Sequence, residues 1–379
     1  MKVFKRKWMI LKQKMDTTME DKKMNLEKYG FTKEMLEENI AFGDTNAIPA
    51  RVTAVHRERY QIVCEHGETY ARLKTKEYYV EFEEFPTTGD FVLINYIANG
   101  DSQIIKTLPR KTFFSRLDPT PGRGEQAVAS NFDYVFIMQS LNHDFNEKRL
   151  ERYMTLAWQS GATPIIVLTK ADLVEDYEGY IASIGVVAPG VEVYPVSSKT
   201  GYGMESLKKY LQPEKTVVFL GSSGVGKSSL VNTLAGKEIM GVNGIREDDS
   251  KGRHTTTHRQ LIMLENGAMI IDTPGMRSIG MWDISTGLGE AFEDVEQYLG
   301  TCKFADCKHL TEPGCAIKQA IEAGRLSAER WDSYLKLKNE ARYSDDKTAY
   351  MRDKVKWHKE VAKSSKRMKA DKKKYGGKY

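Results

Sequence analysis

The chain of 379 residues contains few cysteines and has no long apolar run. No stretch approaches the roughly 18 apolar residues that a membrane span requires. The segment of residues 1–24 is basic overall. It contains one apolar patch, Trp8–Leu11, which is shorter than the signal-peptide core of roughly 7 to 15 residues. We therefore expect a cytoplasmic protein without a membrane partner, in which the 4 cysteines stay reduced.

A general excess of basic residues is also absent, because the net positive charge is confined to the C-terminal residues. Residues 336–379 hold 16 Lys and Arg against 6 Asp and Glu, whereas the preceding residues hold 41 against 46. A solvated charged helix is the common explanation of such a run. Its concentration at the C-terminus favours an RNA-binding arm that adds salt-sensitive affinity without sequence choice.

A glycine-rich stretch lies between an apolar run, Thr216–Leu220, and a helix-like run that ends at Leu234. It consists of Gly221, Ser222, Ser223, Gly224, Val225, Gly226, Lys227, Ser228 and Ser229. This is the P-loop in its required context, where backbone N–H groups at a helix N-terminus hold phosphate oxygens. Lys227 is expected to reach the β- and γ-phosphates and the Ser228 hydroxyl to hold Mg²⁺. A glycine-rich turn without a ligand is the alternative, and the complete pattern disfavours it.

Two other strand ends indicate the base. They carry Thr169, Lys170 and Asp172 at the first end, and Ser197, Ser198 and Lys199 at the second. The Asp172 carboxylate can accept hydrogen bonds from N1–H and N2–H₂ of guanine, which adenine cannot supply. The stem of Lys170 would lie over the base, and the backbone at Ser198 and Lys199 could meet O6. Alone, the first motif is weak, but together with the second motif and the P-loop it predicts GTP.

The remaining nucleotide-binding elements follow the P-loop. Asp272 opens the DTPG motif and is expected to contact Mg²⁺ through water, while the Gly275 N–H would sense the γ-phosphate. Before this motif, Thr255 or Thr256 could close the Mg²⁺ shell. An ordinary small GTPase places the guanine motifs last, whereas here they come first. The order predicts a circular permutation, which domain termini close together at the surface permit.

The residue after DTPG bears on mechanism. Ras places a water-orienting glutamine there, but this chain has Met276, whose thioether cannot position water. Unaided hydrolysis should therefore be slow. Our candidate for the missing polar group is His254 in the first switch. The alternative is that His254 only caps or anchors that segment.

Four potential metal ligands fall within 14 residues: Cys302, Cys307, His309 and Cys315. Three thiolates and one imidazole complete the tetrahedral shell of Zn²⁺, and a shell with four protein ligands makes the metal structural. The spacing is not that of a standard zinc finger, so the residues alone leave the metal open. Cys64, isolated in an alternating run, is expected to be an ordinary core cysteine.

Five short runs with a period of two occupy the N-terminal third. They are Arg51–Val55, Tyr60–Glu65, Glu68–Lys74, Phe91–Tyr96 and Ser102–Leu108. Five such strands suit a small closed barrel of the OB type, a fold that commonly holds nucleic acid. A structural adaptor barrel remains an alternative. The linker that follows could touch RNA, or it could tuck Phe113 and Phe114 into an interdomain seam.

The permuted order, the GSSGVGKSSL, GRHTTT and DTPG motifs, the cysteine–histidine cluster and the β-rich segment resemble a known family. This is the family of ribosome small-subunit-dependent GTPases called RsgA or YjeQ, and the resemblance covers roughly residues 46–335. It implies a bacterial assembly factor that binds the small ribosomal subunit and its rRNA. It also implies that the subunit stimulates hydrolysis of GTP to GDP, and it strengthens the assignment of one structural Zn²⁺.

We therefore expect a monomeric multidomain protein with an OB-type β-barrel, a circularly permuted P-loop α/β GTPase domain and a C-terminal α-helical zinc-binding module. The predicted parts are an N-terminal arm at 1–45, the barrel at 46–110, the GTPase at 111–282, the zinc module at 283–343 and a basic tail at 344–379. Within the arm, the spacing of its apolar residues predicts a short helix at Tyr29–Ala41.

Three alternative functions remain open. An ATP-using P-loop protein is disfavoured by Asp172, and competition between GTP and ATP would decide it. An RNA-binding scaffold with negligible turnover is favoured by Met276. A GTPase that acts on the large ribosomal subunit is a closer variant. GTP turnover with each ribosomal subunit would separate the last two from the expected function.

Overall fold

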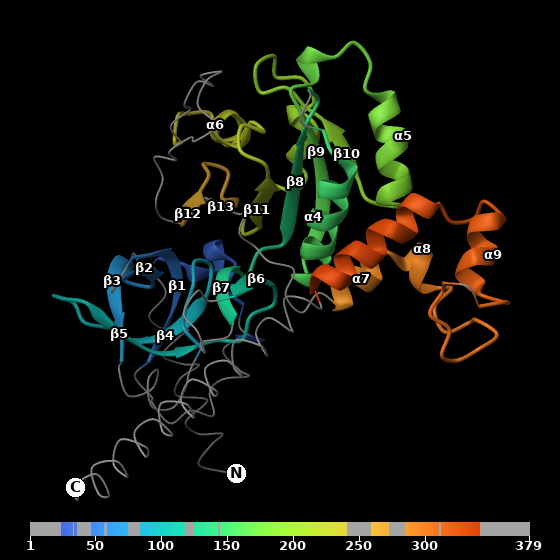
Figure 1. Ribbon diagram of the computed structural model, residues 1–379. Helices are drawn as coiled ribbons and strands as arrows, with labels where there is room; N and C mark the ends of the chain where they lie inside the picture. Colours follow the sequence, from blue (N-terminus) through green and yellow to red (C-terminus); the bar gives the residue numbers. More distant parts are fainter. Residues whose placement is uncertain are drawn as a thin grey trace, which may run out of the picture.

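The computed structural model describes most of the chain from residue 24 to residue 341 (Figure 1). The described ranges are 24–32, 34–35, 47–56, 59–74, 84–117, 125–142, 145–240, 259–272, 285–310 and 312–341. Within these ranges, no helix has the length and apolar character to cross a membrane.

Five strands form a closed barrel. They are β1 (Ile48–Val55), β2 (Tyr60–Cys64), β3 (Gly67–Leu73), β4 (Phe91–Asn95) and β5 (Ser102–Thr107). The pairing order β1-β2-β3-β5-β4 returns to β1, and β3 pairs with β5 in parallel while the other pairs are antiparallel. Alternating apolar residues such as Val52, Ile62 and Ile104 fill the interior. The predicted barrel is confirmed, and Cys64 is a buried member of its core.

A second sheet carries the nucleotide motifs. Its strands are β8 (Tyr134–Ser140), β9 (Thr163–Thr169), β10 (Val193–Pro195), β11 (Thr216–Gly221), β12 (Gln260–Met263) and β13 (Met269–Asp272). They lie in the order β10-β9-β8-β11-β13-β12, all parallel except β12. The P-loop strand β11 comes late in the chain yet lies at the centre of the sheet. The permuted α/β GTPase fold is thereby confirmed.

Helices cover both faces of this sheet. The core on one face includes residues of α4 (Glu147–Gln159) and α5 (Glu178–Val187), and the core on the other includes residues of α6 (Lys227–Ala235). Asn146 caps α4 by accepting a hydrogen bond from the Arg149 amide at 2.9 Å. Two short 3₁₀ helices, η2 (Ala171–Leu173) and η3 (Met204–Leu207), follow β9 and β10. The result is the layered arrangement expected of a doubly wound domain.

The barrel and the nucleotide sheet are continuous. Strand β1 pairs with β12 at Ala54 and Gln260, so the two sheets form one 11-stranded sheet. Figure 1 shows the barrel, in blue and cyan, below the nucleotide sheet. Between them in the chain, β6 (Phe113–Leu117) and β7 (Glu125–Ser130) form an antiparallel hairpin. This hairpin replaces the plain linker that we expected.

The two phenylalanines of the hairpin behave differently. Phe114 is 3% exposed and stacks on Phe132 with ring centroids 4.9 Å apart, whereas Phe113 is 38% exposed. The seam interpretation is therefore correct for Phe114 alone. Phe113 lies at the surface.

The N-terminal segment starts differently from the prediction. Tyr29 ends a 3₁₀ helix, η1 (Leu26–Tyr29), and Gly30 follows with φ of +78°. A left-handed residue ends a helix, so the helix predicted from Tyr29 onward cannot begin there. Leu26, Tyr29 and Phe31 are buried in the main core. Most of the rest of the predicted helix lies outside the described residues.

The C-terminal helices follow one another outward from α4, against which α7 packs (Figure 1). They are α7 (Ser285–Ala291), α8 (Glu293–Glu296), α9 (Ala316–Glu322) and a helical stretch at 328–341. Helix α7 approaches α4 so closely that a Cβ on Gly287 would lie 2.2 Å from the Thr155 carbonyl oxygen. Phe292 and Ile317 belong to the same core as α4. The C-terminal helices are thus attached directly to the nucleotide domain.

Candidate nucleotide site and cysteine–histidine cluster

The predicted P-loop connects β11 to α6. Gly224 and Gly226 have φ of +76° and +101°, a backbone conformation that costs other residues energy. A Cβ on Gly221 would lie 3.0 Å from Val225 Cγ1 and 3.1 Å from Met138 Cβ. Gly226 immediately precedes Lys227, the first residue of α6. The loop therefore presents the N-terminal end of this helix, which is the geometry that attracts phosphate.

The first guanine motif is bonded to the P-loop. The Thr169 hydroxyl donates to the Val225 carbonyl at 2.5 Å, and the Lys170 ammonium donates to the Gly224 carbonyl at 3.0 Å. Lys170 has a φ of +59°, so the chain turns sharply as β9 ends. Thr169 and Lys170 thus place this motif directly beside the proposed phosphate cradle.

The second guanine motif contacts the first. The buried Ser197 hydroxyl donates to Asp172 Oδ1 at 2.6 Å, and the Ala171 amide donates to the Val196 carbonyl at 3.0 Å. Asp172 itself is exposed. Ser197 orients this carboxylate because a serine hydroxyl offers one directed donor. Ser198 and Lys199 follow in the same loop, so the structure brings together all six residues predicted to bind guanine.

Two residues of the phosphate site form an ion pair. Lys227 Nζ lies 2.7 Å from Asp272 Oδ1, and Asp272 is 3% exposed. Ser228 is the next residue along α6. An ammonium and a carboxylate therefore meet where the P-loop strand and β13 end, beside the first turn of α6. A triphosphate with Mg²⁺ offers each charged group a partner of opposite sign.

Five predicted residues lie outside the described ranges. They are Gly275, Thr255, Thr256, His254 and Met276. Their roles remain predictions from the sequence.

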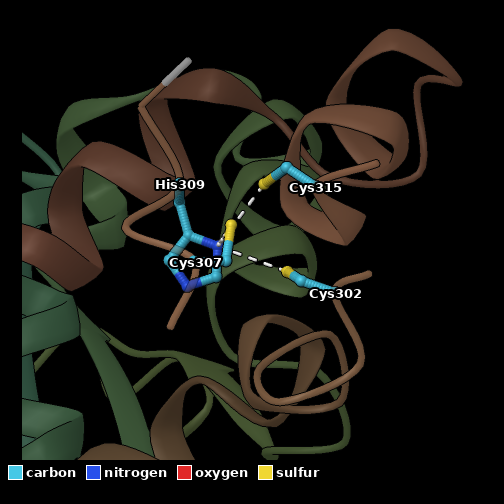
Figure 2. A group of neighbouring side chains, drawn as sticks. All are labelled: Cys302, Cys307, His309 and Cys315. Atoms are coloured by element: carbon cyan, nitrogen blue, oxygen red, sulfur yellow. Dashed lines mark hydrogen bonds between the residues drawn. The ribbon is translucent and has the colours of Figure 1, made fainter. Parts of the chain in front are cut away.

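The cysteine–histidine cluster is compact (Figure 2). The ligand atoms of Cys302, Cys307, His309 and Cys315 all lie within 4.8 Å of one another. His309 Nδ1 is 3.5, 3.7 and 3.4 Å from the sulfurs of Cys302, Cys307 and Cys315. A tetrahedral Zn²⁺ with its usual bond lengths requires N···S separations of about 3.5 Å.

Hydrogen bonding alone does not explain this arrangement. One imidazole nitrogen offers either one N–H or one lone pair, yet His309 Nδ1 faces three sulfurs (Figure 2). Such convergence is what a common metal centre imposes, and the cluster could hold a zinc ion. The Trp331 ring meets the His309 ring edge-on at 5.4 Å and supports its orientation.

The thiols of the cluster differ in acidity. Desolvation alone would raise the pKa of Cys302, but hydrogen bonds, first that of the Ala316 amide at 3.3 Å, bring this pKa below its ordinary value. Desolvation raises the pKa of Cys307 to about 11. A bound cation would favour the thiolate at every sulfur.

Some contacts at the nucleotide site were not evident from the sequence. The hydroxyl groups of Tyr177 and Tyr202 are hydrogen-bonded, and this pair links the chain after Asp172 to the loop after Lys199. The two tyrosines are distant in the sequence, and no sequence pattern predicts their contact. The hydroxyl of Thr169 was predicted beside the base, but its bond to the P-loop was not.

Comparison with solved structures agrees with the fold. YjeQ from Thermotoga maritima matches with a TM-score of 0.58 at 25% identity, over 77% of this chain and 97% of that one. YloQ, described as a circularly permuted GTPase, matches with a TM-score of 0.53 at 25% identity, over 83% and 98%.

Comparison with curated sequences gives closer relatives. A protein of Listeria monocytogenes named small ribosomal subunit biogenesis GTPase RsgA 2 is 49% identical over 84% of this chain and 90% of its own. A protein of the same name from Lactiplantibacillus plantarum is 42% identical over the same shares. Residues 107–282 match the family described as RsgA GTPase. With this identity over most of both chains, the protein belongs to the RsgA GTPase family.

Proposed function

We propose that this GTPase acts on the small ribosomal subunit as a late assembly factor, and that the subunit stimulates its hydrolysis of GTP to GDP and phosphate. The observation that carries the proposal is the convergence of the P-loop, both guanine motifs and Asp272 in one site, because these groups together suit GTP with Mg²⁺. The names of the relatives supply the partner. A monomer in the cytoplasm suits this role.

The residues divide the work at the site. The P-loop residues from Gly221 to Ser229 hold the phosphates, with Lys227 on the β- and γ-oxygens and Gly275 sensing the last phosphate. Asp172 selects guanine, and Ser197 orients the Asp172 carboxylate. Ser228, Asp272 and a threonine at 255 or 256 would hold Mg²⁺, which neutralises charge on the phosphates. His254 is our candidate for positioning the attacking water, because Met276 has no polar group for this.

The C-terminal helices form a zinc-bearing module in this proposal. Cys302, Cys307, His309 and Cys315 are its ligands, and the fit of the N···S separations to a tetrahedral site supports them. A closed shell of this kind stabilises the fold rather than reacting. The barrel, the GTPase and this module, with an N-terminal arm and a basic tail, are the five parts that we propose.

The test is GTP turnover by the purified protein, alone and with added small or large ribosomal subunits. We expect strong stimulation by the small subunit and little by the large one. Stimulation by the large subunit alone would assign the protein to that particle. Stimulation by neither would favour an RNA-binding scaffold.

Variants assign the roles within that assay. Lys227→Ala should lower stimulated turnover at least about 100-fold, because the phosphate charge loses its ammonium. Lys208→Ala is the matched control, since Lys208 is exposed and pairs only locally with Glu205. His254→Ala should lose stimulated turnover while GTP still binds. Normal turnover in that variant would reject the proposed role of His254.

A further inference from the structure

Arg51 is a charged side chain in the seam between the barrel and the nucleotide domain. It lies on β1 and is 1% exposed. Its guanidinium N–H groups face five acceptors: the carbonyls of Tyr29, Gly89 and Asn131, the hydroxyl of Thr216 and the sulfur of Met269. An arginine has five such N–H groups. One side chain thus joins five separate segments of the chain.

Two of these acceptors belong to the strands that carry the nucleotide site. Thr216 is the first residue of β11 and accepts at 3.1 Å, and Met269 is the first residue of β13, with its sulfur at 3.3 Å. These same strands end at Gly221 and Asp272. Arg51 therefore holds the N-terminal ends of the two strands whose C-terminal ends form the phosphate site.

No carboxylate is among the described acceptors of Arg51. Burial lowers the pKa of Arg51 to about 10, so the side chain stays a cation at neutral pH, and the charges of Asp133 and Asp90 favour that form. Asp90 is itself held by Arg110 through two bonds of 2.8 Å. The fixed dipoles of these acceptors, together with the Phe91 ring 4.8 Å away, must therefore solvate the charge. Such solvation is lost when the acceptors move apart, so the cation is sensitive to the geometry of the seam.

The barrel also contacts β12, which pairs with β13, the strand that leads into the DTPG motif. Strand β1 pairs with β12 at Ala54 and Gln260, and the Thr88 hydroxyl donates to the Arg259 carbonyl at 3.4 Å. The Gly89 amide donates to the Val52 carbonyl at 2.9 Å, which ties the loop around Thr88 to β1. A displacement of the barrel would therefore reach β11, β12 and β13 together.

We propose that Arg51 is a positioning residue that couples the barrel to the nucleotide site, so that RNA bound at the barrel changes the rate of GTP turnover. The identity of that RNA as part of the small subunit rests on the proposed function. Arg51 touches neither nucleotide nor RNA in this scheme. Arg51 sets the position of the barrel relative to β11 and β13. RNA binding that shifts the barrel would therefore shift the strands that end at the P-loop and at Asp272.

The test compares Arg51→Met and Arg51→Lys with the wild-type protein and with Arg152→Met. Methionine keeps an unbranched side chain without donors, and lysine keeps the charge with three donors in place of five. Arg152 lies on α4 and pairs with Glu340, away from the barrel. For each protein we would measure basal kcat and KM, binding to the small subunit by sedimentation, and stimulated turnover.

We expect both Arg51 variants to keep basal kcat, KM and subunit binding within about threefold and to lose at least about tenfold of the stimulation. Arg152→Met should keep the wild-type stimulation. An Arg51 variant that is folded, binds the subunit and is stimulated normally would overturn the proposal. If neither Arg51 variant folds, Thr216→Val is the second test. This nearly isosteric substitution at a buried position removes one hydrogen-bond acceptor of Arg51. It should lose about threefold of the stimulation, and normal stimulation there would overturn the proposal.

A separate readout distinguishes this proposal from the proposed function. Hydrogen exchange of the β1 and β2 amides should differ between GDP and a non-hydrolysable GTP analogue in the wild-type protein, and should not differ in Arg51→Met or Thr216→Val. If wild-type turnover does not respond to either ribosomal subunit but exchange responds to nucleotide, the partner is wrong and the coupling holds. If wild-type exchange ignores the nucleotide, the coupling is wrong.

Discussion

The nucleotide domain has two seams, and each contains a buried arginine in a different electrostatic setting. Arg51 in the barrel seam donates to carbonyls, a hydroxyl and a sulfur. Arg330 in the C-terminal seam donates to Glu151 at 2.9 Å and to both carboxylate oxygens of Asp294. Each guanidinium also lies over a phenylalanine ring, Arg51 over Phe91 at 4.8 Å and Arg330 over Phe292 at 3.9 Å. The first cation is solvated by dipoles, whereas the second is neutralised by two anions.

This difference indicates different uses for the seams. A cation that is paired with carboxylates keeps a low energy only in one closed network, which suits permanent attachment. The dipoles around Arg51 come from five segments, so their arrangement depends on how those segments are placed. We infer that the C-terminal seam extends the nucleotide domain rigidly, while the barrel seam responds to what the barrel binds.

Removing a ligand of the proposed zinc ion should have the largest effect and should act on one side of the comparison only. Cys307→Ala breaks the ligand set, and structural zinc sites contribute an apparent folding free energy of about 10 kcal/mol or more. We expect the zinc content to fall to near zero and the helices at 316–322 and 328–341 to lose structure, with the barrel intact. Elemental analysis and hydrogen exchange measure this. Cys64 is a core cysteine of the barrel, so Cys64→Ala is the control and should keep its zinc. A full zinc content in Cys307→Ala would refute the ligand assignment.

The next effect is on the ion network of the C-terminal seam. Arg330→Met leaves Glu151, which is 6% exposed, without its cation, and breaking a buried pair on one side costs about 3–5 kcal/mol. Denaturant unfolding measures this loss. The double variant Arg330→Met with Glu151→Gln should recover part of it, because the unpaired charge is gone. If the single variant lost less than about 1 kcal/mol, the network would not hold this seam.

Two glycines offer a matched comparison of backbone contact at the seams. A Cβ on Gly89 would lie 2.1 Å from the Ser130 carbonyl oxygen, and one on Gly287 would lie 2.2 Å from that of Thr155. Overpacking of this kind costs about 1–3 kcal/mol. Gly89 also has a φ of +98°, which adds roughly 1 kcal/mol for alanine. A Cβ on Gly287 would also lie 2.6 Å from Gln159 N and 2.7 Å from Gln159 Cβ. Thermal unfolding should therefore show both alanine variants to be destabilised, and a variant with the wild-type Tm would show that its seam yields easily.

Much of the fold could be predicted because its signals are local. The barrel strands were placed within a few residues because an alternating pattern is readable in a single strand, as in Tyr60–Cys64. The P-loop and the four residues of the cysteine–histidine cluster are likewise short motifs, and the structure brings each set together.

What the sequence did not reveal depends on distant contacts. Arg51 sits in an ordinary strand pattern, and its acceptors are spread from Tyr29 to Met269. The pairing of β1 with β12 joins residues about 200 positions apart. The hairpin of β6 and β7 was obscured by the Pro- and Gly-rich stretch between its strands. No local pattern reports such contacts, and the residue roles in the site remain predictions until variants are measured.

The smallest effect concerns a charged cluster that lies at neither seam. Glu192 accepts hydrogen bonds from Lys209, Tyr194 and Tyr210, and these bonds, that of Lys209 first, lower the pKa of Glu192 from 4.5 to about 2. A lowered carboxyl pKa adds stability above the ordinary value, and this is lost as pH falls through the folded value. The advantage of the wild-type protein over Glu192→Gln should therefore be constant above about pH 5 and decline below it.

Carboxyl NMR titration of Glu192 and the difference in Tm between the two proteins at several pH values measure this directly. Because the cluster is exposed, solvent screens it, and we expect a shift in Tm that is small beside those of the seam variants. Glu205→Gln, in the exposed pair with Lys208, is the control. If Glu192→Gln destabilised the protein as much as Arg330→Met, burial would not be what separates the charged groups of the C-terminal seam from those of the surface.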